Sequence, residues 1–303
     1  MKKIEKQRQF VSRHLDLFRC PTCHEPFTEL QGNSIICRQG HRIDFNKHGY
    51  LHFLNGAANT EYGREMFLAR RQLLTAGLFQ PIIQAIAKAL PNRPLKILDV
   101  GTGEGTPLYQ LASLRPGLDD CLVGFDISKA GVTLATQLAM EAFFCVADLR
   151  QLPFNDHSFD AIVELFSPSD YAEFNRVLAP GGTLVKVIPN ADYLGELRQL
   201  LYDDEDQHAS YDNSRVKELF AKHYPNCQTQ RVRYQFSIPD GLQAALVEMT
   251  PLHWGRGAKQ LTPAELAAFH QVTVDVSLLI TRKVDYRMKL ATQLVVNKKR
   301  HSA

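Results

Sequence analysis

The sequence predicts an α/β protein in which a mostly parallel, Rossmann-like sheet is joined to a small metal-binding unit at the N-terminus. The first observation is a series of apolar strands, glycine-rich turns and helices that begins near residue 95 with LKILDVGTGEG. Strands that alternate with helices are typical of parallel sheets. The second is a group of three cysteines, Cys20, Cys23 and Cys37, followed by His41. We therefore expect two units of unequal size.

Length and composition fit this division. The 303 residues are 45% hydrophobic and 22% charged, as in globular rather than disordered or fibrous proteins. The net charge is +3, yet residues 1–60 hold nine Lys or Arg against five Asp or Glu, which excludes a uniformly basic nucleic-acid-binding protein and places positive charge at the N-terminus. No apolar run approaches the roughly 18 residues of a membrane span and the start lacks a signal-peptide core, so we expect a soluble, cytoplasmic protein without a membrane partner.

The segment FRCPTCHEPFTELQGNSIICRQGHRIDF has metal-ligand spacing. A CxxC turn lets two thiolates point at one ion, and a second turn supplies another pair. Gly32 and Asn33 suit a hairpin between the two halves. Buried thiols without a metal and a redox CxxC are the alternatives, but neither uses all four residues. Four protein ligands leave no open position for water, which indicates one structural zinc ion rather than a catalytic one. The predicted ligands are Cys20, Cys23, Cys37 and His41.

Residues 61–90 connect the two units. Their apolar residues recur at intervals of three and four, which predicts two helices divided near Gly77 and Pro81. Three arginines in this segment either contact RNA phosphates or form a solvated helix face, and spacing alone favours the solvated face. They are Arg64, Arg70 and Arg71.

The sequence LKILDVGTGEG predicts a buried strand followed by a ligand-binding turn. Gly101, Gly103 and Gly105 let the backbone approach a ligand where side chains would clash. Glycines spaced as GxGxG after Asp99 resemble motif I of class I methyltransferases, which use S-adenosylmethionine, rather than a dinucleotide fingerprint.

Acidic residues follow the next two strands of the series. Asp126 ends the strand CLVGFD, where a carboxylate can accept hydrogen bonds from both ribose hydroxyls of an adenosine. Asp148 and Leu149 follow the third strand, where the acid can bond the adenine amino group and the leucine can pack on its ring. A fourth strand ends in the loop FSPSD, and RVLAPGG turns into a fifth. A doubly wound fold with unrelated chemistry is the alternative, because glycine loops recur across many folds.

The C-terminal third predicts the end of the sheet. RVRYQFSIP and QVTVDVSLLITRK are typical of paired strands that complete a mostly parallel, seven-stranded sheet. VEMTPLHW lies between them and predicts a helix and loop on the substrate side, while NKKRHSA forms a basic tail.

The whole series resembles one family, the RlmA-type 23S ribosomal RNA guanine-N1-methyltransferases, which include the tylosin-resistance methyltransferases. The resemblance rests on FRCPTC with CRQGH, MFLARRQLLTAGLFQPI, ILDVGTGEG, the FSP loop, LAPGG and VEMTPLHW. It implies methylation of guanine N1 in a domain II hairpin of 23S rRNA and a homodimer whose zinc modules flank an RNA-binding cleft. The expected division is a zinc module for RNA recognition at 1–58, a helical connector at 59–92 and a methyltransferase domain at 93–303.

The resemblance also implies cofactor contacts at Gly103 and Glu104. Phe79 occupies a position where relatives place a tyrosine, so any hydroxyl bond there is lost, and Tyr193 occupies a position where relatives place a histidine. The predicted S-adenosylmethionine-binding residues are Phe79, Gly101, Gly103, Glu104, Gly105, Asp126, Asp148, Leu149 and Tyr193.

Guanine N1 carries a proton at neutral pH, so methyl transfer to it requires a general base. Candidate acids near the fourth strand are Glu164, Asp170 and Glu173, of which Asp170 lies in the expected substrate loop. A capping or surface role is the alternative for each. For the whole chain the alternatives are a methyltransferase of small molecules and a zinc-dependent RNA-binding or assembly protein with an inactive core. The zinc unit disfavours the first, and the intact glycine motif with its two acids disfavours the second.

Overall fold

The structure is a computed structural model that describes residues 2–54, 56, 62–203 and 211–284. The domain boundary expected at residues 58 and 59 and the basic tail NKKRHSA lie outside the described residues. Among the helices of the described ranges, none combines the length and the apolar composition needed to cross a bilayer.

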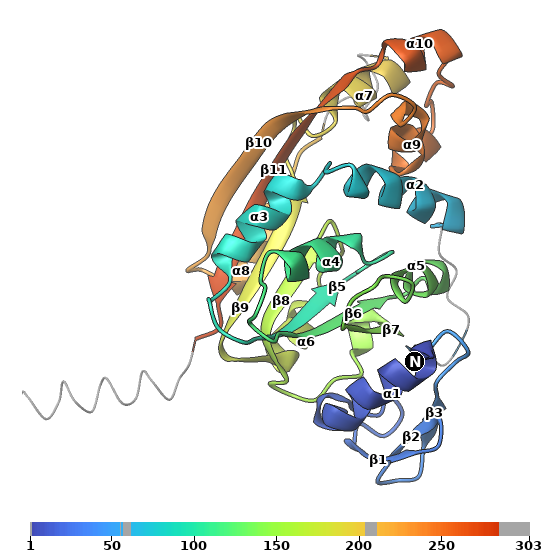
Figure 1. Ribbon diagram of the computed structural model, residues 1–303. Helices are drawn as coiled ribbons and strands as arrows, with labels where there is room; N and C mark the ends of the chain where they lie inside the picture. The colour runs from blue at the N-terminus through green and yellow to red at the C-terminus, as the bar shows by residue number, and fades with distance from the viewer. Residues whose placement is uncertain (1, 55, 57–61, 204–210, 285–303) are drawn as a thin grey trace, which may run out of the picture.

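The N-terminal unit is a three-stranded antiparallel sheet with a helix beside it, at the lower end of the molecule in Figure 1. A two-residue turn joins its first two strands, and Gly32 in that turn has a φ of 59°. This confirms the hairpin predicted at Gly32 and Asn33. The elements are α1 (Lys3–Arg13), η1 (Leu15–Leu17), β1 (Phe27–Gln31), β2 (Ser34–Cys37) and β3 (Arg42–Asp44).

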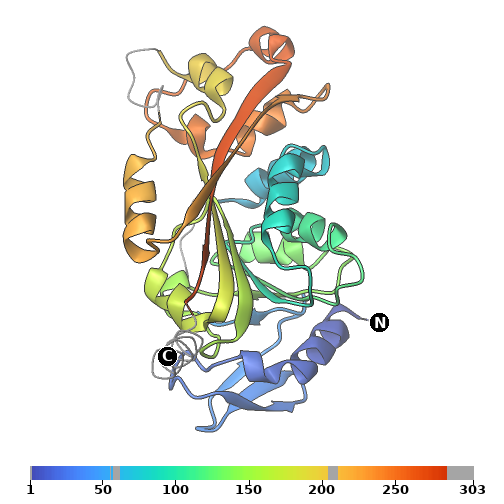
Figure 2. The same cartoon turned by 90° about the vertical axis from the view of Figure 1, so that its left-hand side faces the viewer.

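A large, twisted sheet forms the rest of the core (Figure 2). Its strands lie in the order β10-β11-β9-β8-β5-β6-β7-β4. The pairs β10–β11 and β11–β9 are antiparallel and the others are parallel. The strands are β4 (Leu51–His52), β5 (Lys96–Val100), β6 (Cys121–Asp126), β7 (Phe143–Val146), β8 (Phe159–Leu165), β9 (Leu178–Pro189), β10 (Gln228–Ser237) and β11 (Gln271–Arg282).

The seven predicted strands are therefore present as β5 to β11, with the antiparallel β11 placed between β9 and β10, as the class I methyltransferase fold requires. The eighth strand was not predicted. β4 comes from the end of the N-terminal unit and pairs in parallel with β7, joining Leu51 to Cys145 and His52 to Val146. The prediction missed it because two residues carry no periodicity.

Helices cover both faces of the sheet because its strands are apolar on both sides. One buried core lies under α2 to α5 and α7, and a second lies under α6, α8 and the N-terminal unit. The two connecting helices are confirmed as α2 and α3, divided at Gly77, which has a φ of 98°. These helices are α2 (Arg64–Thr75), α3 (Gln80–Ala89), α4 (Thr106–Ser113), α5 (Lys129–Ala135), α6 (Tyr171–Val177), α7 (Gly195–Leu201) and α8 (Ser214–His223).

VEMTPLHW forms the predicted helix and loop next to α2. The remaining short elements are η2 (Leu149–Gln151), α9 (Gln243–Glu248), η3 (Pro251–Trp254) and α10 (Pro263–Ala268).

The N-terminal unit is packed firmly on the large sheet. Phe18 forms a β-bridge with Phe154, and its ring meets that of Phe143 edge-on at 5.1 Å. The backbone N–H of Phe53 donates to the carbonyl of Val146 at 2.8 Å, which extends the β4–β7 pairing. The two units thus share one hydrophobic core.

Candidate active site and metal cluster

The four predicted metal ligands converge in the N-terminal unit. Their donor atoms all lie within 4.8 Å of one another. Sγ of Cys23 and Sγ of Cys37 are 3.5 Å apart, and Nδ1 of His41 lies 3.4 Å from Sγ of Cys37 and 3.7 Å from Sγ of Cys20. Ligands held tetrahedrally at zinc distances lie about 3.3–3.8 Å from one another. The donor set and its spacing therefore fit one zinc ion.

Tight backbone turns present these ligands. The N–H of Cys20 donates to the carbonyl of Glu25, and the N–H of Cys37 donates to the carbonyl of His41, which closes each half of the cluster. Gly40, in the second turn, has a φ of 82°. A cleft of about 360 Å³ lies next to the cluster, between the ribbon and the end of β4. Its walls include Cys20, His41, Arg42, His52, Phe53 and Leu54.

The glycine loop follows β5 and folds tightly at the carboxyl edge of the sheet. Gly101, Gly103 and Gly105 have φ values of 67°, 56° and 85°. A Cβ atom on Gly101 would lie 2.0 Å from Oγ of Ser167, and one on Gly103 would lie 3.1 Å from the ring of Phe67. Glycine is therefore required here both by the backbone conformation and by neighbours above and beside the loop.

Asp126 holds this loop against the neighbouring strand. One of its oxygens accepts from the N–H of Gly103 at 2.9 Å, and the other accepts from the N–H of Ser128 at 2.8 Å. Burial raises the pKa of Asp126, an effect that these two hydrogen bonds oppose. A carboxylate oxygen has two lone pairs, so the capacity to accept from ribose hydroxyls remains.

Asp148 and Leu149 lie at the same edge, directly after β7. The N–H of Ala147 donates to the carbonyl of Asp126 at 3.1 Å, which places the two acids side by side along the edge. Arg150 donates to the carboxylate of Asp148 from its backbone and its guanidinium, and these bonds lower the pKa of Asp148. The structure thus brings the motif I glycines, Asp126 and Asp148 together.

Glu104 is brought to this edge too, but its side chain is occupied. Its carboxylate is buried and accepts from Nε of Arg71 at 2.8 Å and from Oγ1 of Thr106 at 2.6 Å. The guanidinium of Arg71 also donates to the carbonyls of Glu104 and Leu134. The preference for a solvated helix face is therefore wrong for Arg71, which fastens α2 to the glycine loop, whereas Arg64 is exposed.

Phe79 and Tyr193, which lie far apart in the sequence, meet through a third aromatic ring. The ring of Phe166 meets Phe79 edge-on at 5.4 Å and lies 5.1 Å from the ring of Tyr193. Phe166 directly follows β8 and has a φ of 60°, which is uncommon for a bulky residue and occurs at functional sites. Phe166 was not singled out from the sequence, although its position at the end of the fourth strand pointed to it.

The three candidate bases differ in how their carboxylates are used. Glu164 is fully buried, lies 2.5 Å from Nζ of Lys186 and accepts from Ser169, and burial raises its pKa to about 7. Glu173 accepts from the N–H of Leu152 and pairs with Arg176. Asp170 caps α6 through Oδ1, which accepts from the N–H of Glu173 at 3.0 Å.

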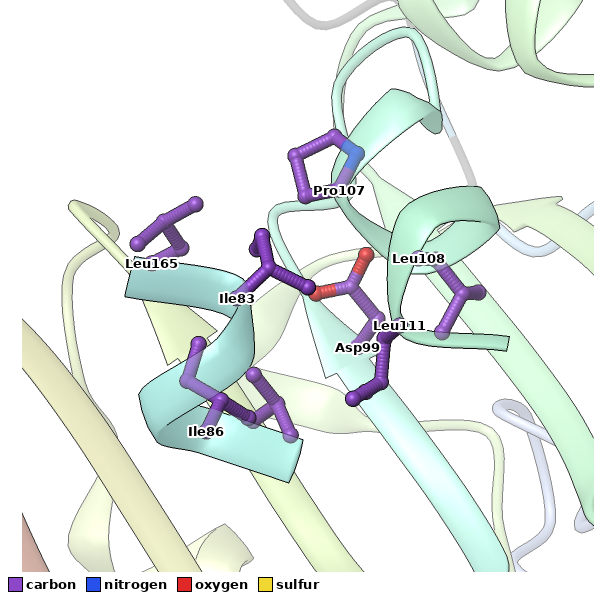
Figure 3. Close-up of a pocket in the computed structure, with 8 residues that line it drawn as sticks. Ile83, Ile86, Asp99, Pro107, Leu108, Leu111 and Leu165 are labelled. Carbon is purple, nitrogen blue, oxygen red and sulfur yellow. The ribbon is translucent and has the colours of Figure 1, made fainter. Parts of the chain in front are cut away.

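Asp99 lies beneath the glycine loop in apolar surroundings. Figure 3 shows its carboxylate at a cavity of about 10 Å³ whose other lining side chains are all apolar. Oγ1 of Thr102 donates to it at 2.6 Å, yet burial raises the pKa of Asp99 to about 6. The cavity has room for about one water molecule and is too small for a cofactor.

Two family models match the chain. One, described as "RlmA, N-terminal", is a zinc-ribbon model and covers residues 18–55, and the other, described as "Methyltransferase domain", covers residues 97–182. The first spans the metal cluster and the second spans the glycine loop with its acids.

Curated relatives extend the likeness to the ends of both units. The Bacillus subtilis (strain 168) protein YxjB, provisionally named a 23S rRNA (guanine-N1)-methyltransferase, is 36% identical over 88% of this chain and 97% of its own length. The 23S rRNA (guanine(748)-N1)-methyltransferase of Streptomyces fradiae is 29% identical over 91% of this chain and 99% of its own length. The demethylmenaquinone methyltransferase of Thermus thermophilus is 35% identical, but over only 34% of this chain and 50% of its own length.

The fold, the glycine loop and the metal cluster identify S-adenosylmethionine and one zinc ion as the cofactors. Since a relative more than one-third identical matches both units over nearly their whole length, the chain belongs to the RlmA-type family of 23S rRNA (guanine-N1)-methyltransferases.

Proposed function

We propose that this protein transfers the methyl group of S-adenosylmethionine to N1 of a guanine in a domain II hairpin of 23S rRNA. The observation that carries the proposal is the joint presence of zinc ribbon and methyltransferase core in relatives named for this reaction, which match about nine-tenths of the chain. The small-molecule methyltransferase matches only about a third of it. A ribosomal RNA substrate would place the protein in the cytoplasm.

The residues at the carboxyl edge can bind and orient the cofactor. We propose that the backbone of Gly101 to Gly105 passes under its methionine part and that Asp126 accepts from its ribose. Asp148 and Leu149 then hold the adenine, while Phe79 and Tyr193 line the methyl side. When bound, the cofactor supplies an activated methyl group, so the protein chiefly has to align it with the target nitrogen.

The proton on guanine N1 must leave before or during transfer. We propose Asp170 as the group that accepts it. Among the described residues, Oδ1 of Asp170 has a recorded partner and Oδ2 has none, whereas both oxygens of Glu164 and of Glu173 are bonded. Asp170 also lies in the loop that follows β8, next to the glycine loop.

The zinc unit provides the second proposed contact with RNA. Arg38, Arg42 and Lys47 are exposed on it, and the cleft of about 360 Å³ opens beside it. We propose that residues 1–58 recognise RNA and that residues 93–303 form the catalytic domain, with residues 59–92 connecting the two. We also propose that the protein acts as a homodimer. Because the ribbon shares a core with the large sheet, its role is best tested by charge reversal at Arg38 and Lys47 in the full chain. Loss of RNA affinity with unchanged cofactor affinity is expected.

The reaction is tested with labelled S-adenosylmethionine and 23S rRNA that lacks this modification. Nucleoside mass spectrometry should detect 1-methylguanosine, and reverse transcription should stop at a single guanine in domain II because a methyl group on N1 blocks Watson–Crick pairing. A variant with Gly101→Val, which closes the glycine loop, is the inactive control. Cofactor binding without transfer to free or ribosome-bound RNA would overturn the proposal.

A further inference from the structure

Two adjacent arginines on α2 have very different surroundings. Arg71 is fully engaged, with hydrogen bonds to the Glu104 carboxylate and to two backbone carbonyls. Arg70 is also partly buried, yet no described residue is recorded as accepting a hydrogen bond from its guanidinium. Its Cζ lies 6.0 Å from the centroid of the Phe79 ring. A guanidinium has five N–H donors, and because Arg70 is only partly buried its donors are open to water or to an acceptor outside the chain.

Electrostatic coupling locates the guanidinium at the cofactor edge. Burial raises the pKa of Asp99, of Asp126 and of Tyr193, and the charge of Arg70 opposes the rise in all three. These residues come from the end of β5, the end of β6 and the segment after β9. A side chain whose charge acts on all three groups lies near this edge of the sheet, as its contact with the ring of Phe79 also indicates.

The cofactor has a group that needs such a cation. S-adenosylmethionine ends in an α-amino acid, with one ammonium and one carboxylate. The buried acids at and beneath this edge, namely Asp99, Glu104 and Asp126, make it a poor place for a carboxylate unless a cation lies beside it. A guanidinium binds a carboxylate through two parallel N–H···O bonds.

The other cations near this edge are committed elsewhere. Arg71 serves Glu104. Arg198 donates to the carbonyl of Tyr193 and lies over the ring of Tyr211 at 5.5 Å. Among the described arginines that act on this edge, Arg70 therefore differs in that its guanidinium donates to no other described residue.

We infer that Arg70 binds the carboxylate of the methionine moiety of S-adenosylmethionine, held in place by the ring of Phe79. This inference rests on the proposed methyl-transfer function. It also gives a role to Phe79, whose position lacks the hydroxyl expected from relatives: a phenyl ring still offers the face on which a guanidinium stacks. The residue acts on cofactor affinity and orientation rather than on the proton at guanine.

The test compares two ligands on the full-length, zinc-loaded protein by isothermal titration calorimetry, without RNA. S-adenosylhomocysteine carries the carboxylate, and 5′-methylthioadenosine lacks the whole amino acid. Arg70→Gln should raise the Kd of S-adenosylhomocysteine about 10- to 100-fold, the usual value of a charge-assisted bond, and should leave the Kd of 5′-methylthioadenosine within about twofold. Arg70→Lys keeps the positive charge but cannot form two parallel hydrogen bonds to a carboxylate. Its Kd for S-adenosylhomocysteine should therefore lie between those of the wild type and of Arg70→Gln.

Arg71→Gln is the matched control, because it removes an arginine from the same helix. Since it also loosens the glycine loop, it should lower the affinity for both ligands. The inference would be overturned if Arg70→Gln lost affinity for both ligands equally, or if it kept wild-type affinity for S-adenosylhomocysteine. Either result would leave the proposed methyl-transfer function unaffected. Failure of the wild-type protein to bind S-adenosylhomocysteine would overturn the proposed function as well. Decarboxylated S-adenosylmethionine gives an independent check: Arg70→Gln should not change its affinity.

Discussion

At the level of single residues, Asp99 is an acid buried in apolar surroundings beneath the glycine loop. The carboxyl lies among isoleucine, leucine and proline side chains, and its main polar partner is the hydroxyl of Thr102. The cavity wall is apolar because the same residues pack α3 and α4 on the sheet. An acid in such surroundings binds its proton more tightly in the folded state than in the unfolded chain.

Replacement of Asp99 by Asn should therefore change the pH dependence of stability. The folded pKa of about 6 lies above the ordinary value of 3.8, so Asp99 lowers stability progressively as the pH rises from about 4 to about 7. The neutral amide lacks this penalty, and the variant should gain about 2 kcal/mol over wild type between about pH 4.5 and about pH 7.5. Urea unfolding at several pH values measures the difference in unfolding free energy between the variant and the wild type. Other titrating groups contribute equally to both proteins and so cancel from this difference. A difference that is constant with pH would contradict the raised pKa.

Asp170 has two separable roles in the structure, as the cap of α6 and as the proposed base. Asn keeps the capping acceptor but cannot take a proton, so Asp170→Asn should lower kcat at least about 100-fold with stability and cofactor affinity unchanged. Asp170→Ala should in addition lose about 1 kcal/mol of stability through the missing cap. Single-turnover methylation and urea unfolding separate the two effects. Full turnover by the Asn variant would remove Asp170 from the reaction.

Spacing in the sequence was enough to predict which four residues gather into the metal cluster, because each pair belongs to one short turn. It was not enough for Phe166 or Arg70. Phe166 has a left-handed backbone and contacts two rings that come from distant parts of the chain, neither of which a local sequence pattern reveals. The acids near Arg70 lie more than twenty positions away in the chain, and a single sequence does not encode that proximity in any local pattern.

At the level of elements, α2 is fastened to the glycine loop. Helical periodicity predicted this helix correctly. The ring of Phe67 and the side chain of Arg71, both on α2, contact the glycine loop. The direction of an arginine on a helix depends on what the helix packs against, which is why the solvated interpretation of Arg71 was wrong.

Arg71→Gln should consequently destabilise the fold. It leaves the buried carboxylate of Glu104 without its cation, and the loss of one partner of a buried pair costs about 3–5 kcal/mol. Arg70→Gln, one residue away, should change stability by less than about 1 kcal/mol because it breaks no recorded hydrogen bond. Chemical denaturation of the two variants side by side measures this contrast. Equal stability of the two would contradict the role of Arg71 in fastening α2 to the glycine loop.

At the level of the whole molecule, the zinc unit and the large sheet share one core, so we expect them to unfold together. The unit contributes β4 to the sheet and buries Phe18 and Phe53 in the shared core. Composition and motif order predicted the two units, but not their fusion, since a two-residue strand and a few aromatic contacts leave no trace in a sequence pattern.

Removal of zinc by a chelator should lower the unfolding temperature of the entire chain. Chelation removes several kcal/mol of metal-binding free energy. In a chain of this size each kcal/mol of lost stability lowers the thermal unfolding midpoint by about 2–4 °C, so a fall of roughly 10 °C is expected. Trp254 is the single tryptophan and lies on η3, which packs against α9 outside the N-terminal unit. Its fluorescence should report the same lowered midpoint as far-ultraviolet circular dichroism. A tryptophan transition that stays in place after chelation would show that the two units unfold independently.

The pairing of β4 with β7 also sets an order of events during synthesis. Leu51 and its partner Cys145 are separated by about 90 residues, which a ribosome adds in about 5–20 s. Throughout that interval the nascent ribbon already has all four metal ligands, but the sheet that covers Leu51 and Phe53 does not yet exist. The nascent N-terminal unit can therefore bind its metal before the sheet is complete, and until β7 emerges Leu51 and Phe53 have no sheet to cover them.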